Sequence, residues 1–292
     1  IYFTTKKNMM INVGIIGFGK MGSIRAKAIE NSKLGIISKI YDTNLSKHPK
    51  YNIVSSVEEI TMDADIHAIF ICTPNYLNKE LTIKGLKAGK HIFCEKPPAF
   101  NEIDVKNIIK VEKKMQKKLM YGFNHRHHDS IKMIKDLVME KTYGNILWMR
   151  GRYGKSVNKN FYNNWRANSK KSGGGILLDQ GIHMLDLFTY LNGEFNDVKA
   201  FISNLYWDSD IEDNAFVILR NSKTDVVASL HSTMTQWRHL FSLEVFLEHG
   251  YFVLNGLKTS SGTYGDEILT IAKNRTEAPR AKWDDEERYS FT

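Results

Sequence analysis

A glycine-rich loop near the start of the chain constrains the fold more than any other stretch. The loop, GFGKMG, lies between an apolar run, INVGIIG, and a helix-like segment, KMGSIRAKAIENS. In this setting the first glycine permits a tight turn, the second lets a pyrophosphate approach the backbone, and the third lets the helix pack closely on the sheet. The stretch therefore predicts a βαβ unit that binds a dinucleotide at the start of its helix. The predicted contacts of the loop with this cofactor are Gly17, Phe18, Gly19, Lys20, Met21 and Gly22.

An acidic residue at the end of the next apolar run favours one dinucleotide over the other. Asp42 ends the run LGIISKIYD, about 20 residues after the loop, as in proteins that bind NAD. A carboxylate at this position accepts the adenosine ribose hydroxyls and repels a 2′-phosphate. The predicted cofactor is therefore NAD, although Lys47 and His48 follow closely enough to accept a phosphate and leave NADP open.

The rest of the first half alternates short apolar strands with helical segments as far as residue 123. This rhythm predicts a doubly wound parallel sheet covered by helices on both faces, with a domain boundary after residue 123. Two strands end in polar turns, ICTPN and CEKPP, at the edge where such sheets bind ligands. These turns add Thr73, Pro74, Asn75, Glu95 and Lys96 to the predicted cofactor contacts.

Lys96 is the candidate for chemistry within these turns. Pro97 restricts it to extended geometry, so the lysine is held on a stiff backbone at the cofactor edge. Beside an oxidised nicotinamide, an amine in this place can act as an acid, a base or a group that orients a hydroxyl. Taken alone, without these surroundings, the same residue would be interpreted as a solvated lysine before a proline turn.

The second half, residues 124–292, changes rhythm to segments that alternate in or out with period two, which predicts an antiparallel sheet. One helix interrupts it, over residues 173–191, and is apolar almost all round. Asp179, His183 and Asp186 follow one another at i, i+4 and i+7, and so fall on a single face. A polar stripe on a buried helix lines a cavity or cleft, and the three glycines at its start are expected to expose amides to a ligand. The alternative is a satisfied internal Asp–His pair.

The motifs GFGKMG, ICTPN, CEKP and GGGxLLDxGIHxxD, in this order, resemble the Gfo/Idh/MocA family of NAD(P)-dependent oxidoreductases. The resemblance covers essentially the whole chain. Within the family, the chain looks most like members from cell-surface sugar and nucleotide-sugar pathways. It implies a Rossmann domain, 1–123, and a C-terminal α+β domain with a large open antiparallel sheet, 124–292. It also implies that Asp179 and His183 serve in substrate binding and proton transfer, and that Lys96 is the lysine of the family's EKP motif.

These residues together predict an oxidoreductase that acts on a secondary hydroxyl of a sugar or sugar derivative, including a nucleotide sugar. His183 takes the hydroxyl proton, Asp179 orients the substrate, and Lys96 holds the reacting oxygen, although Lys96 and His183 both stay candidates for the principal base. Two alternatives stay open. One is a non-catalytic sugar sensor that binds a dinucleotide, and the other is a glycosidase-type enzyme that keeps NAD tightly bound.

Further candidates for substrate binding come from two polar stretches. GFNHRHHDS offers Asn124 and Arg126, with His125 as another residue that could line the pocket. No metal is expected there, because adjacent side chains cannot all converge on one ion. NNWRAN offers Trp165 and Arg166. The Arg166 guanidinium could clamp a phosphate or a carboxylate of the substrate. The alternative is that this stretch is a surface loop without a binding role. A third stretch, residues 212–214 (EDN), fits a cap or turn as well as a ligand role.

Composition sets the remaining expectations. The formal charge is +9, but the lysines are scattered, so nucleic acid is not an expected partner. No apolar run approaches the roughly 20 residues of a membrane span. Cys72 and Cys94 lie in apolar strands as small hydrophobes, which indicates a reducing, cytoplasmic setting. The open sheet needs cover, so a homodimer or homotetramer through it is expected. Family members usually continue for a few dozen residues, so a last packing helix is expected to be missing.

Overall fold

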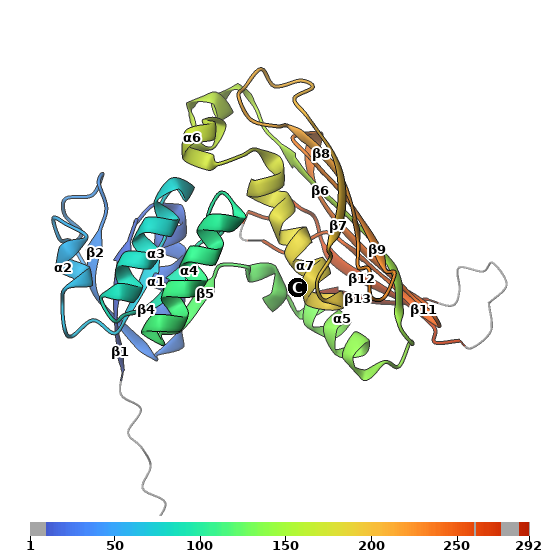
Figure 1. Cartoon of the computed structure of the whole chain (residues 1–292), viewed down its shortest axis with the longest axis horizontal. Coiled ribbons are helices and arrows are strands. Elements are labelled where there is room, and N and C mark those ends of the chain that lie inside the picture. Colours follow the sequence, from blue (N-terminus) through green and yellow to red (C-terminus); the bar gives the residue numbers. More distant parts are fainter. Residues whose placement is uncertain (1–9, 260, 276–285, 292) are drawn as a thin grey trace, which may run out of the picture. The chain divides into compact units, whose positions relative to one another are not determined.

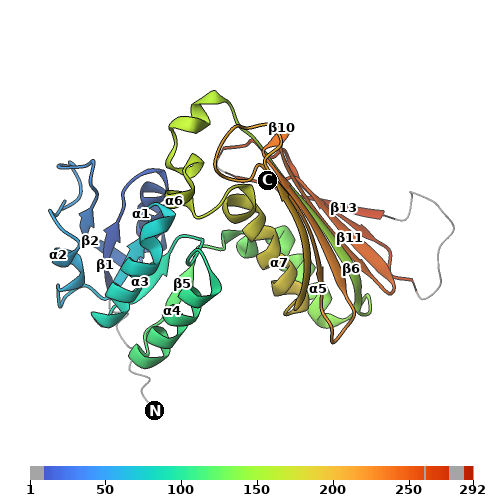
Figure 2. The ribbon, with the colours of Figure 1, turned by 45° about the horizontal axis from the view of Figure 1, so that its top comes forward.

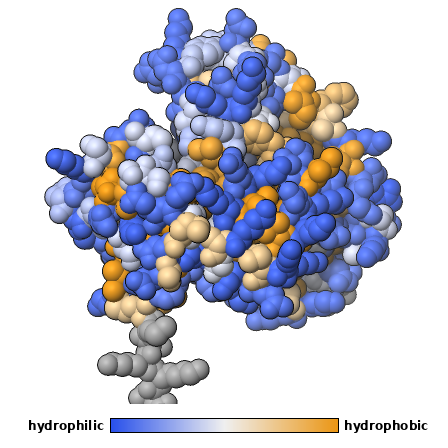
Figure 3. Space-filling model, turned by 60° about the vertical axis from the view of Figure 1, so that its left-hand side comes forward, coloured by the Kyte–Doolittle hydropathy of each residue, from blue (hydrophilic) through white to orange (hydrophobic). Residues whose placement is uncertain are grey.

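The structure of the protein is a computed structural model that describes residues 10–259, 261–275 and 286–291. The chain divides into two compact units, Ile1–Gly122 and Phe123–Thr292, which are described separately (Figure 1). Among the described residues, no helix is both long and apolar enough to cross a bilayer. Hydrophilic side chains cover most of the face drawn in Figure 3, and the hydrophobic ones are scattered over it.

The first unit is built on a five-stranded parallel sheet with the order β2-β1-β3-β4-β5. From β1 the chain first adds β2 on one side and then β3, β4 and β5 on the other side. The crevice at such a change of strand order is where open α/β sheets bind ligands. This confirms the predicted doubly wound parallel sheet. The strands are β1 Ile11–Ile16, β2 Gly35–Tyr41, β3 Ala68–Ile71, β4 His91–Cys94 and β5 Leu119–Tyr121.

Helices cover this sheet because its strands are apolar on both faces. Ile15, Ile40, Ile69 and Ile71 have no exposed surface. The predicted helix over residues 20–32 has those bounds, and the helix that follows β3 begins with a 3₁₀ turn. The helices are α1 Lys20–Ser32, α2 Glu58–Thr61, η1 Asn75–Leu77, α3 Asn78–Lys87 and α4 Glu102–Met115.

The second unit is built on an eight-stranded sheet with the order β13-β12-β11-β10-β6-β9-β8-β7. Its neighbouring strands are antiparallel except for β6 and β9, which are parallel. This confirms the predicted large antiparallel sheet, to which the structure adds one parallel pair. Period-two alternation shows which side chains are buried but not the direction of a strand. The strands are β6 Ile146–Ser156, β7 Asp197–Ser203, β8 Asn214–Arg220, β9 Val227–Thr233, β10 Thr235–Leu247, β11 Gly250–Asn255, β12 Glu267–Ala272 and β13 Glu286–Phe291.

The helices α5 and α7 lie together on one face of this sheet (Figure 2). Met184, Leu187 and Phe188 of α7 are fully buried, and a Cβ added at Gly151 of β6 would lie 2.4 Å from the Met184 side chain. The glycine thus lets the helix come close to the sheet. The helical segments are η2 Asn124–His127, α5 Asp129–Glu140, η3 Lys159–Asn163, η4 Trp165–Ala167, α6 Ser169–Ser172, η5 Leu177–Gly181 and α7 Ile182–Asn192.

The helix predicted over residues 173–191 begins later and differently. Gly173 has a φ of +82° and ends α6, so it cannot start a right-handed helix. The segment η5 is a π-helix, and α7 continues from it. Single π turns inside helices are frequent at functional sites, because the extra residue re-aims the side chains around it. A regular 3.6-residue period, which the sequence suggested, therefore does not hold across the segment that carries Asp179.

Candidate active site

The glycine loop of the first unit has the geometry that a bound pyrophosphate needs. A Cβ added at Gly17, where φ is +89°, would lie 2.6 Å from the Cys72 carbonyl oxygen, and one added at Gly22 would lie 2.2 Å from the Gly17 carbonyl oxygen. At Gly19 an added Cβ would meet nothing within 4 Å. The two outer glycines are thus required by packing, whereas Gly19 opens on free space at the first turn of α1. The loop fits a dinucleotide phosphate.

Asp42 is joined directly to this loop. Its Oδ2 accepts a hydrogen bond of 2.6 Å from the Phe18 amide, and its Oδ1 accepts one of 2.8 Å from the Asn44 amide. Each carboxylate oxygen keeps a second lone pair, which can accept a ribose hydroxyl. Lys20 is exposed and Met21 is half-buried at the start of α1. The carboxylate is therefore held in place for the role that the sequence predicts.

The two residues that kept NADP open lie in different surroundings. The ring of His48 stacks on Tyr51, with the centroids 4.7 Å apart. Lys47 is exposed. The nearby Lys50 forms an ion pair of 2.7 Å with Glu30. Of these three side chains, Lys47 is the one for which no ion pair or ring contact is observed, so it is the one that could most readily accept a 2′-phosphate.

A buried asparagine ties together the turns that follow β3 and β4. Asn78 has no exposed surface, and its amide nitrogen donates to the carbonyl oxygens of Glu95, at 3.1 Å, and Pro97, at 2.9 Å. The hydroxyl of Thr73 donates to its side-chain oxygen at 3.4 Å. Asn78 thereby fixes the backbone on both sides of Lys96, which is half-buried. Sequence reasoning missed Asn78, although a polar residue at the start of an apolar helix face is a usable signal.

The other predicted contacts of the first unit divide into two groups. Asn75 is buried and Pro74 is half-buried at the end of β3, which places them at the ligand edge of the sheet. Glu95 instead accepts a hydrogen bond of 2.7 Å from Arg25 of α1, whose guanidinium also lies over Phe93. The structure therefore shows Glu95 as the partner of a helix cation.

The cysteines of the first unit are both free. Cys94 is buried, and Cys72 directly follows β3. Burial, together with the nearby Glu95 carboxylate, raises the pKa of the Cys72 thiol to about 12. Because thiolates are the reactive form, this cysteine stays protonated and inert at neutral pH.

In the second unit, Asp179 lies between two cations. Lys155 Nζ is 3.2 Å from its Oδ2, and Arg166 Nε is 3.4 Å from its Oδ1. Arg166 also stacks on Trp165, 4.3 Å from the ring centroid. The sequence offered Arg166 as a clamp for a substrate anion, but the structure places it on Asp179. Lys155 was missed, although the alternation of β6 puts it on the same face as Gly151 and Tyr153 and could have identified it.

His183 follows Asp179 by four residues and lies among aromatic rings. Its side chain is 5% exposed, and its ring stacks on His125 with the centroids 4.0 Å apart and the planes at 13°. His125 Nε2 is 2.9 Å from the hydroxyl of Tyr153. Burial, followed by the charge of Tyr264, raises the pKa of Tyr153 well above its ordinary value, so the hydroxyl stays neutral. The site therefore brings a buried imidazole and a neutral hydroxyl together, with the Asp179 carboxylate four residues before His183 in the chain, which suits proton transfer.

Asp186, the third residue of the predicted stripe, is paired with an arginine. Both of its oxygens accept hydrogen bonds from Arg126, from Nε at 2.7 Å and Nη2 at 2.5 Å. That pairing raises the pKa of the Arg126 guanidinium above its usual range. The predicted substrate residue Arg126 is thus engaged in a bidentate ion pair that fixes η2 against α7.

The glycine amides that were expected to bind a ligand are bound by the protein itself. The Gly175 amide donates to Glu212 Oε2 at 2.6 Å, and the Leu177 amide donates to Oε1 at 3.0 Å. A Cβ added at Gly175 would lie 2.0 Å from the Glu212 carbonyl oxygen. The expectation of an amide site for ligands is therefore wrong, and Glu212 has the capping role.

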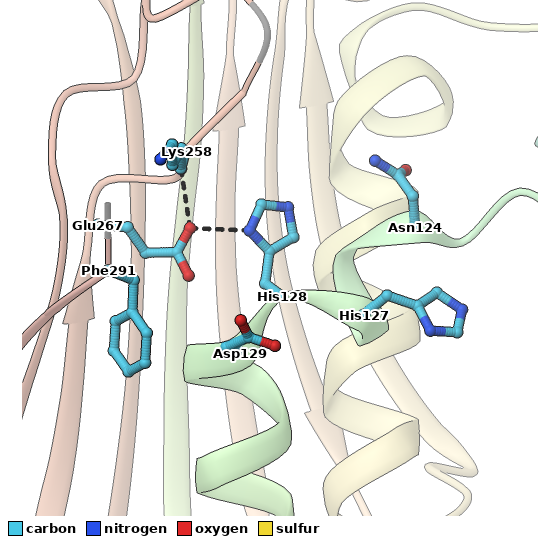
Figure 4. A pocket seen from close by; sticks show the side chains of 7 residues that line it. All are labelled: Asn124, His127, His128, Asp129, Lys258, Glu267 and Phe291. Atoms are coloured by element: carbon cyan, nitrogen blue, oxygen red, sulfur yellow. Dashed lines mark hydrogen bonds and ion pairs between the residues drawn. The ribbon is translucent and has the colours of Figure 1, made fainter. Parts of the chain in front are cut away.

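A buried carboxylate anchors the turn η2, which carries Asn124 and His125. Glu267 is 2% exposed and accepts hydrogen bonds from His128 Nδ1 at 2.8 Å and from the Lys258 amide at 2.8 Å (Figure 4). It accepts a third from Ser130 Oγ at 2.6 Å. Burial alone would raise the pKa of Glu267, but the bonds from His128, Ser130 and Lys258 lower it to about 2.

The carboxylate lines a cavity of about 300 Å³, in which His128 points at Glu267 and His127 points away (Figure 4). Asn124, a predicted substrate residue, is exposed and also lines this cavity. In the part of the chain that the structure describes, no group of three or more His, Cys, Asp or Glu side chains is arranged to hold a metal ion.

Known proteins resemble the chain over both units. It is 32% identical over 210 residues to levoglucosan dehydrogenase of Pseudarthrobacter phenanthrenivorans, a match that covers 66% of the chain and 54%, about half, of that relative. It is 27% identical over 271 residues to myo-inositol 2-dehydrogenase of Thermotoga maritima, covering 88% and 79% of the two chains. A solved structure of levoglucosan dehydrogenase in complex with NADH and levoglucosan superposes with a TM-score of 0.83 at 26% identity, covering 97% and 80%.

Two family models match the two units in turn. The model of the oxidoreductase family with an NAD-binding Rossmann fold matches residues 11–123. The model of the GFO/IDH/MocA C-terminal domain matches residues 131–253. Together they span the glycine loop, Asp42, Lys96, Asp179 and His183, which are the residues that the motifs single out. The chain therefore belongs to the Gfo/Idh/MocA family of oxidoreductases.

Proposed function

We propose that the protein is an NAD-dependent oxidoreductase that transfers hydride between a secondary hydroxyl of a sugar, or sugar derivative, and the nicotinamide. The observation that carries this proposal is the enclosure of His183, which is buried against His125 four residues after a carboxylate. The relatives named as dehydrogenases of levoglucosan and myo-inositol support a polyhydroxylated ring as the substrate class.

The chemistry divides between bound NAD, which supplies the hydride acceptor, and the residues of the chain. His183 takes the proton of the reacting hydroxyl. Asp179, held by Lys155 and Arg166, stays in place to orient the substrate. Lys96 holds the reacting oxygen, and its meeting with His183 over one substrate stays a prediction. Proton transfer by a placed group contributes about 10²–10⁴-fold to the rate.

A substrate panel tests the proposal. Free aldoses, inositols, anhydrosugars, sugar phosphates and nucleotide sugars are incubated with the protein and either NAD or NADP, and reduced nicotinamide is followed by absorbance. We expect turnover with at least one of these compounds and faster turnover with NAD. Tight cofactor binding without turnover of any compound would favour a sensor. Cleavage of a glycoside without net reduction would favour a glycosidase.

Asp42 is expected to set the cofactor preference. Asp42→Ala should weaken NAD binding by about 10-fold, because a charge-assisted hydrogen bond to the ribose is lost and the Phe18 amide loses its acceptor. NADP binding should be unchanged or tighter, because the carboxylate no longer repels the 2′-phosphate. Titration calorimetry with both cofactors measures the two affinities. The exposed Asp65→Ala variant is the matched control, and an unchanged NAD affinity for Asp42→Ala would contradict the assignment.

We propose a second copy of the chain as the partner of the sheet face opposite α5 and α7. On this face Phe201 is 80% exposed, Ile218 is 54% exposed, and Phe216, opposite Phe201 in the register, is 50% exposed. Trp148 stacks on Phe246 farther along the same face. Monomeric soluble proteins rarely expose apolar patches of this kind, and a symmetric dimer covers the same patch on both subunits.

A charge placed in that face tests the dimer. Phe216→Lys should weaken self-association by about 10- to 100-fold, because each subunit then buries an unpaired ammonium. Sedimentation velocity across a concentration series measures the association. Met62→Lys replaces a side chain that is 78% exposed directly after α2 and should leave sedimentation unchanged. A wild-type protein that stays monomeric at high micromolar concentration would exclude this partner.

We also propose a cytoplasmic location. The support is the pair of free cysteines, Cys72 and Cys94, since unpaired thiols are usual in reducing compartments. Fractionation of cells that express the chain tests it.

A further inference from the structure

Three aromatic rings from distant parts of the second unit form an exposed corner. The rings of Tyr206 and Trp237 meet edge to face, with the centroids 4.9 Å apart at 84°. The ring of Trp207 contacts both, at 5.1 Å and 6.3 Å. Tyr206 is 62% exposed and Trp237 is 59% exposed, whereas Trp207 is buried beneath them. We call these three residues the aromatic corner.

A buried carboxylate holds one side of the corner rigidly. Asp213 has no exposed surface and accepts backbone hydrogen bonds from Leu205 at 2.9 Å, Tyr206 at 2.8 Å and Trp207 at 2.9 Å. Although burial alone would raise the pKa of Asp213, these bonds lower it below its usual range. The indole of Trp207 donates to the Met234 carbonyl oxygen at 3.2 Å. An exposed loop with this anchoring presents its rings at little further cost in conformational entropy.

The other side of the corner is held in a strained conformation. Trp237 has a φ of +59°, a left-handed backbone that is unusual for a bulky side chain. It lies where the pairing of β10 with β6 is irregular, between Thr235 and Leu240. Backbone strain of this kind persists only where the surroundings enforce it, and it clusters at binding and catalytic sites.

The aromatic corner adjoins the residues that hold Asp179. The irregular stretch of β10 faces Lys155, since Thr235 pairs with Ser156 and Leu240 pairs with Gly154. Trp207 belongs to the same buried cluster as Ile176, the residue directly before η5. The corner and the carboxylate therefore lie at the same end of the second unit.

We infer that the aromatic corner binds a second ring carried by the substrate, so that the reacting sugar is joined to a nucleobase or to another pyranose. This inference rests on the proposed function. Both kinds of ring offer flat faces that stack on tyrosine and tryptophan. The loop beside the rings, residues 204–208, lines a depression of about 340 Å³, where Asn204 and Asp208 can hydrogen bond to ring substituents. The reacting sugar then lies at His183 and the second ring on Trp237.

The inference is tested by measuring ligand binding to a variant that lacks the proposed base, so that binding is separated from the reaction. The NAD-loaded His183→Ala protein is titrated in a calorimeter with glucose, maltose and uridine diphosphate glucose. We expect at least one of the two larger probes to bind about 10-fold more tightly than glucose. Tighter binding of the nucleotide sugar identifies a nucleobase as the second ring, and tighter binding of maltose identifies a pyranose.

Variants of the aromatic corner then separate binding from structure. Trp237→Gly, added to His183→Ala, should abolish the advantage of the larger probe, whereas Trp237→Phe should keep most of it. Because glycine accepts a φ of +59° without strain, Trp237→Gly should not lower the melting temperature. Met139→Ala, which removes a side chain that is 67% exposed on α5, is the matched control.

Three results would overturn the inference while leaving the proposed function intact. Equal affinities for the three probes would show that no second ring is bound. An equal loss in Met139→Ala would show that stacking is not involved. A Trp237→Gly variant that changes only the sedimentation of the protein would assign the rings to contacts between copies.

Discussion

His183→Gln is expected to lower kcat by about 10²–10⁴-fold, the contribution of a placed acid or base. Glutamine has a similar volume and can hydrogen bond, so the ring stack with His125 is lost but no large cavity opens. Because the glycine loop and Asp42 belong to the first unit, the affinity for NAD should not change. Steady-state kinetics on the substrate that the panel identifies measures kcat and KM separately.

A loss confined to kcat distinguishes proton transfer from binding. If KM alone rose, His183 would bind the substrate without moving its proton. The matched control is His67→Gln, which changes an exposed imidazole of the first unit and should leave both constants as they are. If His183→Gln kept the kcat of the wild type, the proposed mechanism would be contradicted.

Glu267→Gln is expected to lower the free energy of unfolding of the second unit by about 3.5 kcal/mol at pH 7, since the pKa falls by about 2.5 on folding and each pKa unit corresponds to roughly 1.4 kcal/mol. The pKa of Glu267 falls from 4.5 to about 2 on folding, so the carboxylate stabilises the folded state above pH 4.5. That contribution disappears as the pH falls from 4.5 towards 2. The difference between wild type and variant should therefore shrink over this range.

Tryptophan fluorescence during urea unfolding measures this effect selectively, because all five tryptophans lie in residues 123–292. Glu140→Gln changes an exposed carboxylate at the end of α5 and should alter stability by no more than about 0.5 kcal/mol. A loss of the same size in Glu267→Gln would mean that the three hydrogen bonds to Glu267 contribute little. In that case the turn η2 would be held chiefly by Arg126 and Asp186.

Local patterns in the sequence predicted the features that depend on neighbours in the chain. The glycine loop, the strands of the first unit and the helix at residues 20–32 follow from spacing within one βαβ unit. Two glycines are required by contacts within or directly beside the loop, and the third opens on free space. The positions of Asp179 and His183 follow from a motif within a single helical segment. Such features could be predicted because the physics that sets them is local.

Contacts between distant segments could not be predicted in the same way. The partner of Asp186 is Arg126, 60 residues earlier, and the glycine amides are capped by Glu212, 37 residues after Gly175. The irregular pairing that strains Trp237 depends on how β10 meets β6. Each of these depends on which strands and turns become neighbours, and period-two alternation carries no such information. The π turn η5 could not be predicted for a related reason, since Gly173 is constrained by α6 and Gly175 by Glu212.

The anchor of Glu267 on His128 has a consequence for how the protein is made. The two residues are 139 positions apart, so during synthesis on the ribosome the turn with His125 emerges long before its anchor. A nascent chain that ends before residue 267 can pair β6 with β9 but has no carboxylate to fix that turn. The stacked imidazoles are therefore expected to reach their final arrangement only late in synthesis, when β12 joins the sheet.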